Sequence, residues 1–385
     1  MTRPVRVMIS AGEASGDRLG AGLAAALREQ DPGMDLVGMG GPQMRDAGVR
    51  LVQDSAEVAV VGISEVLSRL PQISRAMGRL EAVLENERPD LLVPIDFPDF
   101  NLRLAARAAR HGVGVVYFVS PQVWAWRRRR VHRIRGLVRE MLVLFDFESE
   151  FYRNAGVPVT WVGHPLADAP PARTAPADLR ARIGLRPDST VVGLLPGSRA
   201  GEIHRHTPVL LGVAELLRRE RPALEFLIPL APSAPEAELR KAIRDSGLTR
   251  VHVHQGDFPE LLHTCATAAV ASGTASLDAA TVGLPMVVIY RMNPLSHWIG
   301  KRLIRVDHVA MPNLIAGRRI VPELIQHECN PTRIAAELER YLDDPAHAET
   351  VRTELSGVLR MLGEPGVFRR AAERVRARLP QNETC

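Results

Sequence analysis

Cysteine is scarce in this chain of 385 residues. Cys265, Cys329 and Cys385 are the only three, and they lie far apart. This odd number and wide spacing exclude a disulfide framework and a cysteine-based zinc site, and they favour a reducing compartment. Long apolar runs are also missing, since none reaches the roughly 20 residues that a membrane-spanning helix needs. No apolar leader precedes the first strand pattern. We therefore expect a protein that does not cross a bilayer.

Lysine is almost absent, because Lys241 and Lys301 are the only two, and arginine carries nearly all the basic charge. The 49 basic and 44 acidic residues give a net charge of +5, which suits anionic ligands without requiring nucleic acid. Hydrophobic residues make up 46% of the chain and charged residues 24%, as in a globular protein. One hydrophobic core rarely serves a chain of this length, so we expect two domains.

Strand and helix patterns alternate along the chain, which predicts an α/β fold with parallel sheets. The clearest strand patterns lie at residues 5–10, 36–39, 91–95, 115–119, 141–145, 190–195, 225–230 and 251–254. A segment rich in proline and alanine, residues 167–176, predicts a linker between two such domains. Ligands of parallel sheets gather at the carboxyl ends of the strands, so the loops that follow strands are the candidate sites.

One such loop runs from Ser272 to Thr274. Ser272 and Gly273 leave room for a ligand at the backbone, and Thr274 predicts an N-cap for a helix that begins at Ala275. The first N–H groups of a helix bind phosphate well. Asp278 lies one turn further on the same face, where it is placed to accept hydrogen bonds from sugar hydroxyls. The pattern indicates a nucleotide site, and the alternative is an ordinary capped helix.

A second candidate for phosphate binding follows the strand pattern at residues 190–195. Gly197, Ser198 and Arg199 form a glycine-containing turn that opens a helix. Arg199 can hold a diphosphate through paired hydrogen bonds. Its positive charge would then stabilise the diphosphate, as a metal ion does in other enzymes. Residues 311–318 predict a loop with little helix character, and Asn313 is a donor within it.

The first half of the chain carries the candidate acid and base. Asp96 and Asp99 follow the strand pattern that ends at Ile95, and a carboxylate at a strand end among apolar side chains suits a general base. The alternative for Asp99 is an N-cap of a helix expected near Asn101. His164 also follows a strand pattern, and it is an acid, a phosphate contact or a packed histidine.

Tryptophan and arginine cluster in one segment, which we call the Trp/Arg segment: Trp124, Trp126, Arg127, Arg128, Arg129 and Arg130. Indole rings at the level of lipid headgroups and guanidinium groups on lipid phosphates would suit an anionic membrane surface. The alternative is a solvated helix face with two half-buried indoles. His252 and His254 share a strand face without a third ligand, so we interpret them as structural, and we expect no metal site.

Taken together, several segments resemble the lipid-A-disaccharide synthase family. They are SAGEASGD (10–17), IDFPDFN (95–101), VSPQVWAWRRRRV (119–131), VGHPLAD (162–168), LLPGSRAGEI (194–203), ASGTASLD (271–278), YRMNP (290–294) and PNLIAGR (312–318). Each motif is weak by itself, but together and in this order they are specific.

The resemblance implies an inverting glycosyltransferase of the GT-B type that uses a nucleotide sugar. Two Rossmann-like domains would face a cleft, an acceptor and lipid domain at residues 1–168 and a UDP-sugar domain at 169–345. Helices in residues 346–385 would return to the N-terminal domain. A homodimer is possible in this family. The protein would be cytoplasmic and peripheral on the inner membrane of a Gram-negative cell.

The implied reaction joins UDP-2,3-diacylglucosamine to 2,3-diacylglucosamine 1-phosphate, forms a β-1,6-linked disaccharide and releases UDP. Asp99 matches the aspartate that acts as base on the acceptor 6-hydroxyl, and Arg199 matches the arginine on the diphosphate. No metal or other cofactor is expected. Asp278 departs from the family pattern, which usually has Glu there. The remaining implied contacts are, for UDP, Gly197, Ser198, Ser272, Gly273, Thr274 and Asn313, and, for sugar or lipid, Glu13, Ser15, Gly16, Trp124, Trp126 and His164.

Two rival functions stay open at this point. Another GT-B enzyme, either a transferase or an epimerase, would turn over a UDP-sugar without acyl chains. A lipid or nucleotide carrier would bind its ligand without releasing UDP. The combination of Asp99 with Arg199 favours an enzyme.

Overall fold

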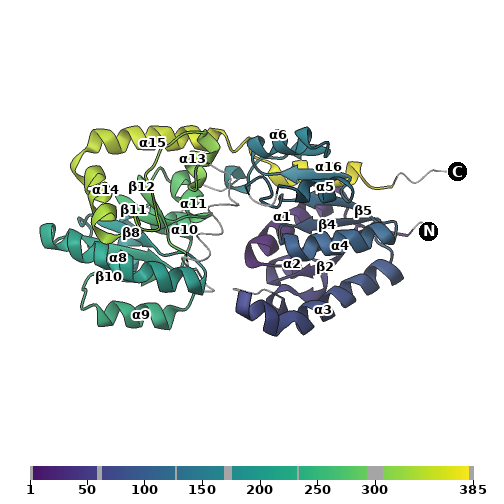
Figure 1. The fold of residues 1–385 in the computed structure, drawn as a ribbon, viewed down its shortest axis with the longest axis horizontal. Helices are drawn as coiled ribbons and strands as arrows, with labels where there is room; N and C mark the ends of the chain where they lie inside the picture. Colours follow the sequence, from purple (N-terminus) through teal and green to yellow (C-terminus); the bar gives the residue numbers. More distant parts are fainter. Residues whose placement is uncertain are drawn as a thin grey trace. The chain divides into compact units, whose positions relative to one another are not determined.

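A computed structural model gives the structure of the chain and describes residues 3–58, 63–125, 128–168, 176–231, 234–292 and 307–380. The chain divides into two compact units (Figure 1). Unit 1 comprises Met1–Asp168 and Leu362–Cys385, and unit 2 comprises Ala169–Met361. The return to unit 1 begins at Leu362, whereas the sequence placed it at residue 346. Residues 169–175 of the predicted linker lie outside the described residues.

Unit 1 is built on a seven-stranded parallel sheet with the order β3-β2-β1-β4-β5-β6-β7. Its strands are β1 (Arg6–Ala11), β2 (Asp35–Gly40), β3 (Arg50–Asp54), β4 (Leu91–Ile95), β5 (Gly114–Phe118), β6 (Glu140–Val143) and β7 (Val159–Trp161). The central strands, LLVPI in β4 and GVVYF in β5, are buried along their whole length. Continuous apolar runs of this kind are typical of parallel strands that are covered on both faces.

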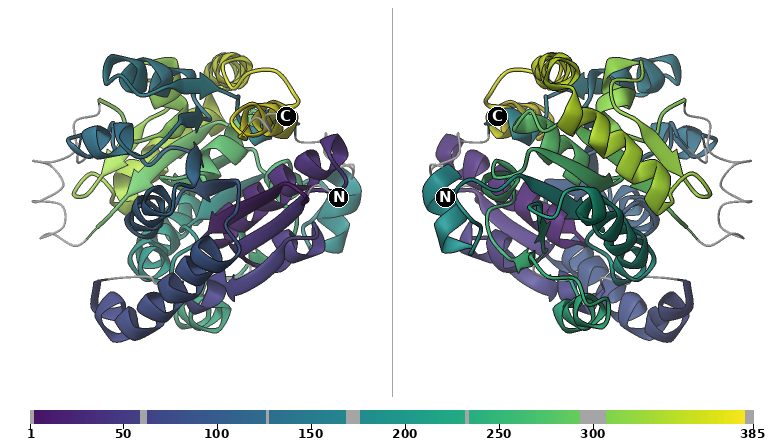
Figure 2. Two further views of the ribbon diagram at one scale, coloured as in Figure 1. Left: turned by 90° about the vertical axis from the view of Figure 1, so that its right-hand side faces the viewer. Right: turned by 90° about the vertical axis from the view of Figure 1, so that its left-hand side faces the viewer.

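Helices cover both faces of the first sheet (Figure 2). They are α1 (Ala14–Gln30), α2 (Pro42–Asp46), α3 (Ile63–Asn86), α4 (Pro98–Arg110), α5 (Arg130–Arg135), α6 (Asp146–Asn154) and α16 (Val367–Ala377). Neighbouring side chains of β1 enter different cores, because strand side chains alternate between faces. Val7 and Ile9 share a core with Leu23 of α1, whereas Met8 shares one with Leu80 of α3.

The C-terminal helix α16 completes the core of unit 1. Val367, Ala371 and Val375 are fully buried in the same core as α1. The two helices approach closely at Gly22, where an added Cβ would lie 2.5 Å from the ring of Phe368. A larger residue at position 22 would therefore require the Phe368 ring to move.

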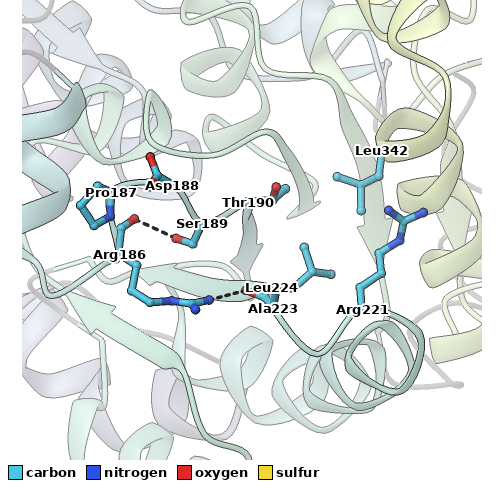
Figure 3. Close-up of a pocket in the computed structure, with 9 residues that line it drawn as sticks. All are labelled: Arg186, Pro187, Asp188, Ser189, Thr190, Arg221, Ala223, Leu224 and Leu342. Atoms are coloured by element: carbon cyan, nitrogen blue, oxygen red, sulfur yellow. Dashed lines mark hydrogen bonds between the residues drawn. The ribbon is translucent and has the colours of Figure 1, made fainter.

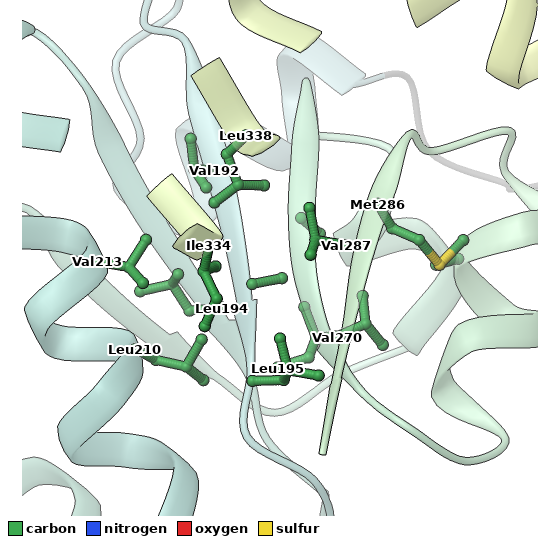
Figure 4. Close-up of a cluster of buried hydrophobic side chains, with 14 of the residues drawn as sticks. Val192, Leu194, Leu195, Leu210, Val213, Val270, Met286, Val287, Ile334 and Leu338 are labelled. Carbon is green, nitrogen blue, oxygen red and sulfur yellow. The ribbon is translucent and has the colours of Figure 1, made fainter. Parts of the chain in front are cut away.

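Unit 2 is built on a six-stranded parallel sheet with the order β10-β9-β8-β11-β12-β13. Its strands are β8 (Val191–Leu195), β9 (Glu225–Pro229), β10 (Val251–His254), β11 (Thr267–Ala271), β12 (Met286–Tyr290) and β13 (Glu323–Ile325). Its helices are α7 (Pro176–Arg182), α8 (Ala200–Glu220), α9 (Glu236–Asp245), α10 (Phe258–Leu262), α11 (Ala275–Thr281), α13 (Met311–Ala316), α14 (Pro331–Asp343) and α15 (Pro345–Arg360). Side chains of β8 pack between α8 and α14, as Leu194, Leu210 and Ile334 show (Figure 4).

Two local differences from the sequence pattern stand out. Proline usually interrupts a helix, but α3 runs from Ile63 to Asn86 with Pro71 inside it. Residues 311–316 form a helix, α13, within the segment 311–318 that the sequence predicted as a loop. Within the part of the chain that the structure describes, no helix is both long and apolar enough to span a membrane.

Candidate functional site

The strand order of each sheet changes direction beside the first strand of its unit. In unit 1, β1 lies between β2 and β4, and in unit 2, β8 lies between β9 and β11. Ligands of open parallel sheets bind at the carboxyl ends of the strands, next to such a change of direction. The loops that begin at Gly12, Asp96, Pro196 and Ser272 occupy these positions. The two sets of loops predicted from the sequence therefore lie at the binding edge of their own sheets.

The loop after β4 has a strained backbone. Asp96 and Phe97 have φ angles of 43° and 49°, in the left-handed region that residues other than glycine rarely adopt. The buried Asn101 donates from Nδ2 to the Asp96 carbonyl oxygen at 2.8 Å and to the Ile95 carbonyl oxygen at 3.1 Å. The Tyr117 hydroxyl donates to the same Asp96 carbonyl at 2.7 Å. These hydrogen bonds hold the turn that begins α4.

Asp99 lies inside the first turn of α4, and Phe97 is the N-cap, so the interpretation of Asp99 as a cap is wrong. The Asp99 side chain is 65% exposed, and its Oδ1 accepts a hydrogen bond from Nη2 of Arg130 at 2.6 Å. The apolar surroundings predicted for this carboxylate are also wrong. Helix α4 begins at Pro98, so Asp99 and Phe100 are successive helical residues that point in different directions. Phe100 is buried in the core, whereas the Asp99 carboxylate faces solvent and a guanidinium.

Within the Trp/Arg segment, Trp124 is half buried. Its Nε1 donates to Oε1 of Glu148 at 3.0 Å, and its ring meets the Phe147 ring edge-on at 5.0 Å between centroids. The only N–H of the indole ring is thus used inside unit 1. This geometry matches the half-buried indole of the alternative interpretation for Trp124. Trp126 and Arg127 lie outside the described residues.

The described arginines of this segment have different surroundings. Arg128 and Arg129 are exposed. Arg128 donates from Nε to the Trp124 carbonyl oxygen at 3.0 Å, and its guanidinium lies 5.8 Å from the centroid of the Phe151 ring. Arg130 begins α5 and pairs with Asp99. Arg130 is therefore part of the surroundings of the candidate base.

Glu148 is a buried carboxyl that the sequence analysis missed. Its side chain is 4% exposed and accepts hydrogen bonds from the Ser120 hydroxyl, from Trp124 Nε1 and from the Phe145 backbone N–H. Burial raises the pKa of Glu148 to about 7, although these hydrogen bonds act in the opposite direction. Glu148 therefore fixes the loop that carries Trp124.

His164 is packed rather than solvated. Its backbone N–H donates to the Leu362 carbonyl at 2.8 Å, and its ring stacks on Phe145 at 5.2 Å between centroids. Burial, with a smaller effect of the Arg18 charge, lowers the pKa of His164 to about 4, so the ring is neutral near pH 7. Nδ1 accepts a hydrogen bond from the Leu166 N–H at 3.2 Å, which places the ring proton on Nε2. The ring can thus donate one hydrogen bond.

The loop after β1 contains Glu13, Ser15 and Gly16. Helix α1 begins at Ala14, with Glu13 as its N-cap. The Asp17 carboxylate is buried and caps a different helix. It accepts hydrogen bonds at 2.7 to 3.0 Å from the first backbone N–H groups at α2, those of Gly41, Gln43 and Met44.

The turn after β8 already holds an anionic group. Oε2 of Glu202 accepts hydrogen bonds from the backbone N–H groups of Ser198 at 3.3 Å and Arg199 at 3.4 Å. Gly197 has a φ of 108°, and an added Cβ would lie 2.4 Å from that oxygen. The Arg199 side chain is 59% exposed, with Nη1 3.7 Å from Oε1 of Glu202. The turn therefore binds the Glu202 carboxylate through two backbone N–H groups and carries the exposed Arg199 guanidinium beside it.

The turn after β11 leads into α11, a helix of seven residues. Thr274 is the N-cap as predicted, but its side chain makes no capping hydrogen bond. Ser276 instead donates from Oγ to the Gly273 carbonyl at 2.7 Å. Gly273 has a φ of 149°, and nothing among the described atoms lies within 4 Å of an added Cβ there. Asp278 lies in the first turn of α11.

Asn313 is fully buried, and its side chain is used within unit 2. Nδ2 donates to the Val321 carbonyl at 2.9 Å and to Oε1 of Glu323 at 2.8 Å. Oδ1 accepts from the backbone N–H groups of Ile320 at 2.7 Å and Val321 at 2.9 Å. Both donors and both acceptor positions are engaged, so the amide is a support for this loop rather than a contact for a nucleotide.

A cavity of about 550 Å³ opens at the other edge of the second sheet (Figure 3). Thr190 precedes β8 and Leu224 precedes β9, so the cavity lies at the amino ends of these parallel strands. Arg186 donates from Nη2 to the Ala223 carbonyl at 2.6 Å within it. The turns predicted to bind phosphate follow the carboxyl ends of the strands, so the cavity is separate from the candidate site. Among the described residues, no group of three His, Cys, Asp or Glu side chains is arranged to hold a metal ion.

Comparison with known proteins decides the family. A family model described as lipid-A-disaccharide synthetase matches residues 7–367. This chain belongs to that family. The lipid-A-disaccharide synthase of Geobacter sulfurreducens is 49% identical over 367 residues, which are 95% of this chain and 95% of that protein. The lipid-A-disaccharide synthase of Myxococcus xanthus is 43% identical over 380 residues, 99% of each chain. The resemblance drawn from the eight segments is confirmed.

Solved structures confirm the fold of this lipid-A-disaccharide synthase family member. A UDP-N-acetylglucosamine 2-epimerase from Neisseria meningitidis, bound to UDP-N-acetylglucosamine, has a TM-score of 0.61 at 14% identity, covering 98% of this chain and 99% of that chain. The glycosyltransferase of kitacinnamycin also has a TM-score of 0.61, at 17% identity, covering 98% of this chain and 100% of that one. At such low identity these matches establish the α/β architecture of two parallel sheets.

Proposed function

We propose that this protein condenses UDP-2,3-diacylglucosamine with 2,3-diacylglucosamine 1-phosphate, to give the β-1,6-linked disaccharide 1-phosphate and UDP. The observation that carries this proposal is the match of nearly the whole chain to lipid-A-disaccharide synthases, at 49% identity to one of them. Epimerases and other glycosyltransferases share the fold at 14% to 17% identity, so the fold by itself does not favour them.

We assign the acceptor chemistry to unit 1. Asp99 would take the proton of the acceptor 6-hydroxyl as its oxygen attacks the anomeric carbon of the donor. Arg130 orients the carboxylate through its hydrogen bond to Oδ1. The strained turn held by Asn101 and Tyr117 fixes the start of α4, and therefore the place of the carboxylate. Attack on the face opposite UDP would invert the anomeric centre.

We assign the leaving group to unit 2. Charge builds on the diphosphate as the bond to the sugar breaks, and a guanidinium with backbone N–H groups stabilises that charge. The Arg199 guanidinium and the turn at Ser272–Thr274 would supply these groups at the carboxyl ends of the strands of the second sheet. The N–H groups of Ser198 and Arg199 would join them by exchanging the Glu202 carboxylate for the diphosphate. Asp278 would accept hydrogen bonds from the ribose, with a side chain about one methylene shorter than the Glu that is usual in the family. These groups would stabilise UDP without a metal ion.

The test is UDP release from UDP-2,3-diacylglucosamine, with and without 2,3-diacylglucosamine 1-phosphate. We expect release to need the acceptor, to resist EDTA and to fall about a hundredfold or more in Asp99→Asn, the loss typical of a missing general base. Asp146→Asn is the matched control, because Asp146 is also exposed in the first turn of a helix of unit 1. It should keep wild-type rates.

Other outcomes separate the rivals. Turnover of UDP-N-acetylglucosamine without acyl chains would favour another UDP-sugar enzyme. Tight binding without UDP release would favour a carrier. A strict requirement for Mg²⁺ would count against the role given to Arg199.

We also propose that the protein binds peripherally to the anionic inner surface of the inner membrane, since both substrates carry acyl chains. Arg128 and Arg129 are exposed and can contact lipid phosphates. The expected result is flotation with phosphatidylglycerol vesicles at low salt, and its loss at high salt or in Arg128→Ala/Arg129→Ala. Absence from the vesicle fraction at both salt concentrations would refute this proposal. A homodimer stays a proposal of the resemblance, and sedimentation velocity would test it.

A further inference from the structure

His206 is a fully buried histidine of α8 that contacts two separate loops of unit 2. Its Nδ1 lies 2.8 Å from the carbonyl oxygen of Pro196, the first residue of the turn that carries Arg199. Its Nε2 lies 2.9 Å from the backbone nitrogen of Arg291, the first residue after β12. One imidazole ring thus joins the loop after β8 to the end of β12.

The two hydrogen bonds allow one protonation state of the ring. A carbonyl oxygen only accepts, so Nδ1 must carry a proton, and a backbone N–H only donates, so Nε2 must carry a lone pair. The neutral ring with its proton on Nδ1 satisfies both. Burial lowers the pKa of His206, which is consistent with a neutral ring, although its hydrogen bond to Pro196 and the nearby Glu202 oppose that shift.

Other side chains hold the same strand end. Arg205, the neighbour of His206 in α8, donates from Nε to the Arg291 carbonyl at 3.1 Å. The Met292 N–H donates to Oε1 of Gln326 at 3.3 Å. The backbone of Arg291 is therefore hydrogen-bonded at both its N–H and its carbonyl. The His206 ring connects this strand end to Pro196 through its two hydrogen bonds.

We propose that His206 is a positioning residue for the diphosphate turn: by bridging Pro196 and Arg291 it sets where Arg199 and the turn's N–H groups meet the leaving group. This inference rests on the proposed function, since it assumes that the turn binds the UDP diphosphate. His206 would make no direct contact with UDP. It acts through the backbone of the turn.

The experiment measures UDP binding by calorimetry to the full-length protein. His206→Phe keeps a ring of similar size but removes both hydrogen bonds, and His206→Asn keeps a donor for Pro196 but lacks an acceptor in the place of Nε2. We expect each variant to bind UDP about tenfold more weakly, which corresponds to one weakened hydrogen bond to a charged group. The KM for the UDP-sugar should rise in parallel.

Thr207→Val is the matched control. Thr207 is the next residue of α8, it is buried, and its hydroxyl has no partner within the described residues. Its UDP affinity should stay at the wild-type value. Thermal melts identify a variant that fails to fold. If His206→Phe fails to fold, His206→Asn provides the test. A purely structural role would lower the melting temperature and leave UDP affinity unchanged in the folded protein.

A double-mutant cycle with Arg199→Ala separates the two proposals. If His206 acts through Arg199, the His206 variants should weaken UDP binding far less in the Arg199→Ala background than in the wild type. Weak binding by Arg199→Ala with wild-type affinity in both His206 variants would overturn the inference and keep the proposed function. Wild-type UDP affinity in Arg199→Ala would overturn the assignment of the turn itself.

Discussion

At the scale of single residues, carboxyl groups of unit 1 differ because their surroundings differ. Asp99 is exposed and pairs with the Arg130 guanidinium. A general base must be accessible in this way, because it exchanges a proton with the substrate. Glu148 is buried and accepts hydrogen bonds from the neutral donors Ser120, Trp124 and Phe145, and burial raises its pKa to about 7. Asp17 is buried at the start of α2 and acts as a cap. Residue type alone does not distinguish these roles.

Glu148 makes stability depend on pH. Its pKa moves from 4.5 in the unfolded chain to about 7 in the folded one, so the folded state binds more protons between these values. The stabilisation is complete below pH 4.5 and is lost as the pH rises through 7, by about 3 kcal/mol in total. We expect the stability of the wild type relative to Glu148→Gln to fall by this amount between pH 4.5 and pH 8, measured by urea unfolding.

The comparison with Glu148→Gln is needed because His164 acts in the opposite direction. Burial lowers the pKa of His164 to about 4, so its contribution to stability grows as the pH rises from 4 to 6.5. That contribution is present in both proteins and cancels in the difference. A difference in stability that does not change with pH would contradict a raised pKa for Glu148.

At the scale of elements, the turn from β4 to α4 couples backbone strain to the candidate base. Two successive residues, Asp96 and Phe97, have positive φ angles, each at a cost on the order of 1 kcal/mol or more. The Asn101 amide and the Tyr117 hydroxyl offset this cost through the Asp96 carbonyl. The turn is therefore stable only while its neighbours in β5 and α4 are in place.

We predict that Tyr117→Phe loosens this turn. The lost hydrogen bond should lower the free energy of unfolding by about 1 kcal/mol, and kcat should fall because Asp99 is less well placed. Tyr341→Phe is the matched control, since the Tyr341 hydroxyl donates to the Met286 carbonyl at 3.2 Å in unit 2, away from the turn. It should cost similar stability. Equal kcat in both variants would show that the turn does not position Asp99.

At the scale of the whole molecule, the two ends of the chain build unit 1 together. Glu140 of β6 is 1% exposed and accepts hydrogen bonds from Arg374 at 2.6 Å and Arg378 at 2.7 Å, at the C-terminal end of the chain. Burial alone would raise the pKa of Glu140, but hydrogen bonds from Thr160 and both arginines outweigh it and lower the pKa. Asp168 in addition accepts from the Val367 N–H at 3.1 Å, at the start of α16.

Glu140→Gln should therefore destabilise unit 1 selectively, by about 1 to 2 kcal/mol, because it removes a buried charge from two arginines whose side chains are 38% and 39% exposed and so partly compensated by water. Hydrogen exchange should speed up in α16 and α1 and stay unchanged in β8 and β11. Glu225→Gln is the matched control, since Glu225 is also buried and pairs with Arg186 at 2.9 Å in unit 2. Its effect should be confined to unit 2. Uniform exchange throughout the chain in either variant would refute separate units of stability.

The sequence by itself determined the α/β architecture, the family and the loops that form the candidate site. Strand and helix patterns are local, and parallel strands bring the loops after them to one edge of each sheet. Only the tertiary structure decided what several side chains do. Asp17 accepts a hydrogen bond from the N-cap residue of a helix, 24 residues further on. The Asn313 side chain forms its hydrogen bonds within its own loop, and His206 accepts one from a backbone N–H 85 residues away. Such partners depend on packing between elements that are distant in the sequence. A buried polar group must form hydrogen bonds with the groups that this packing brings next to it.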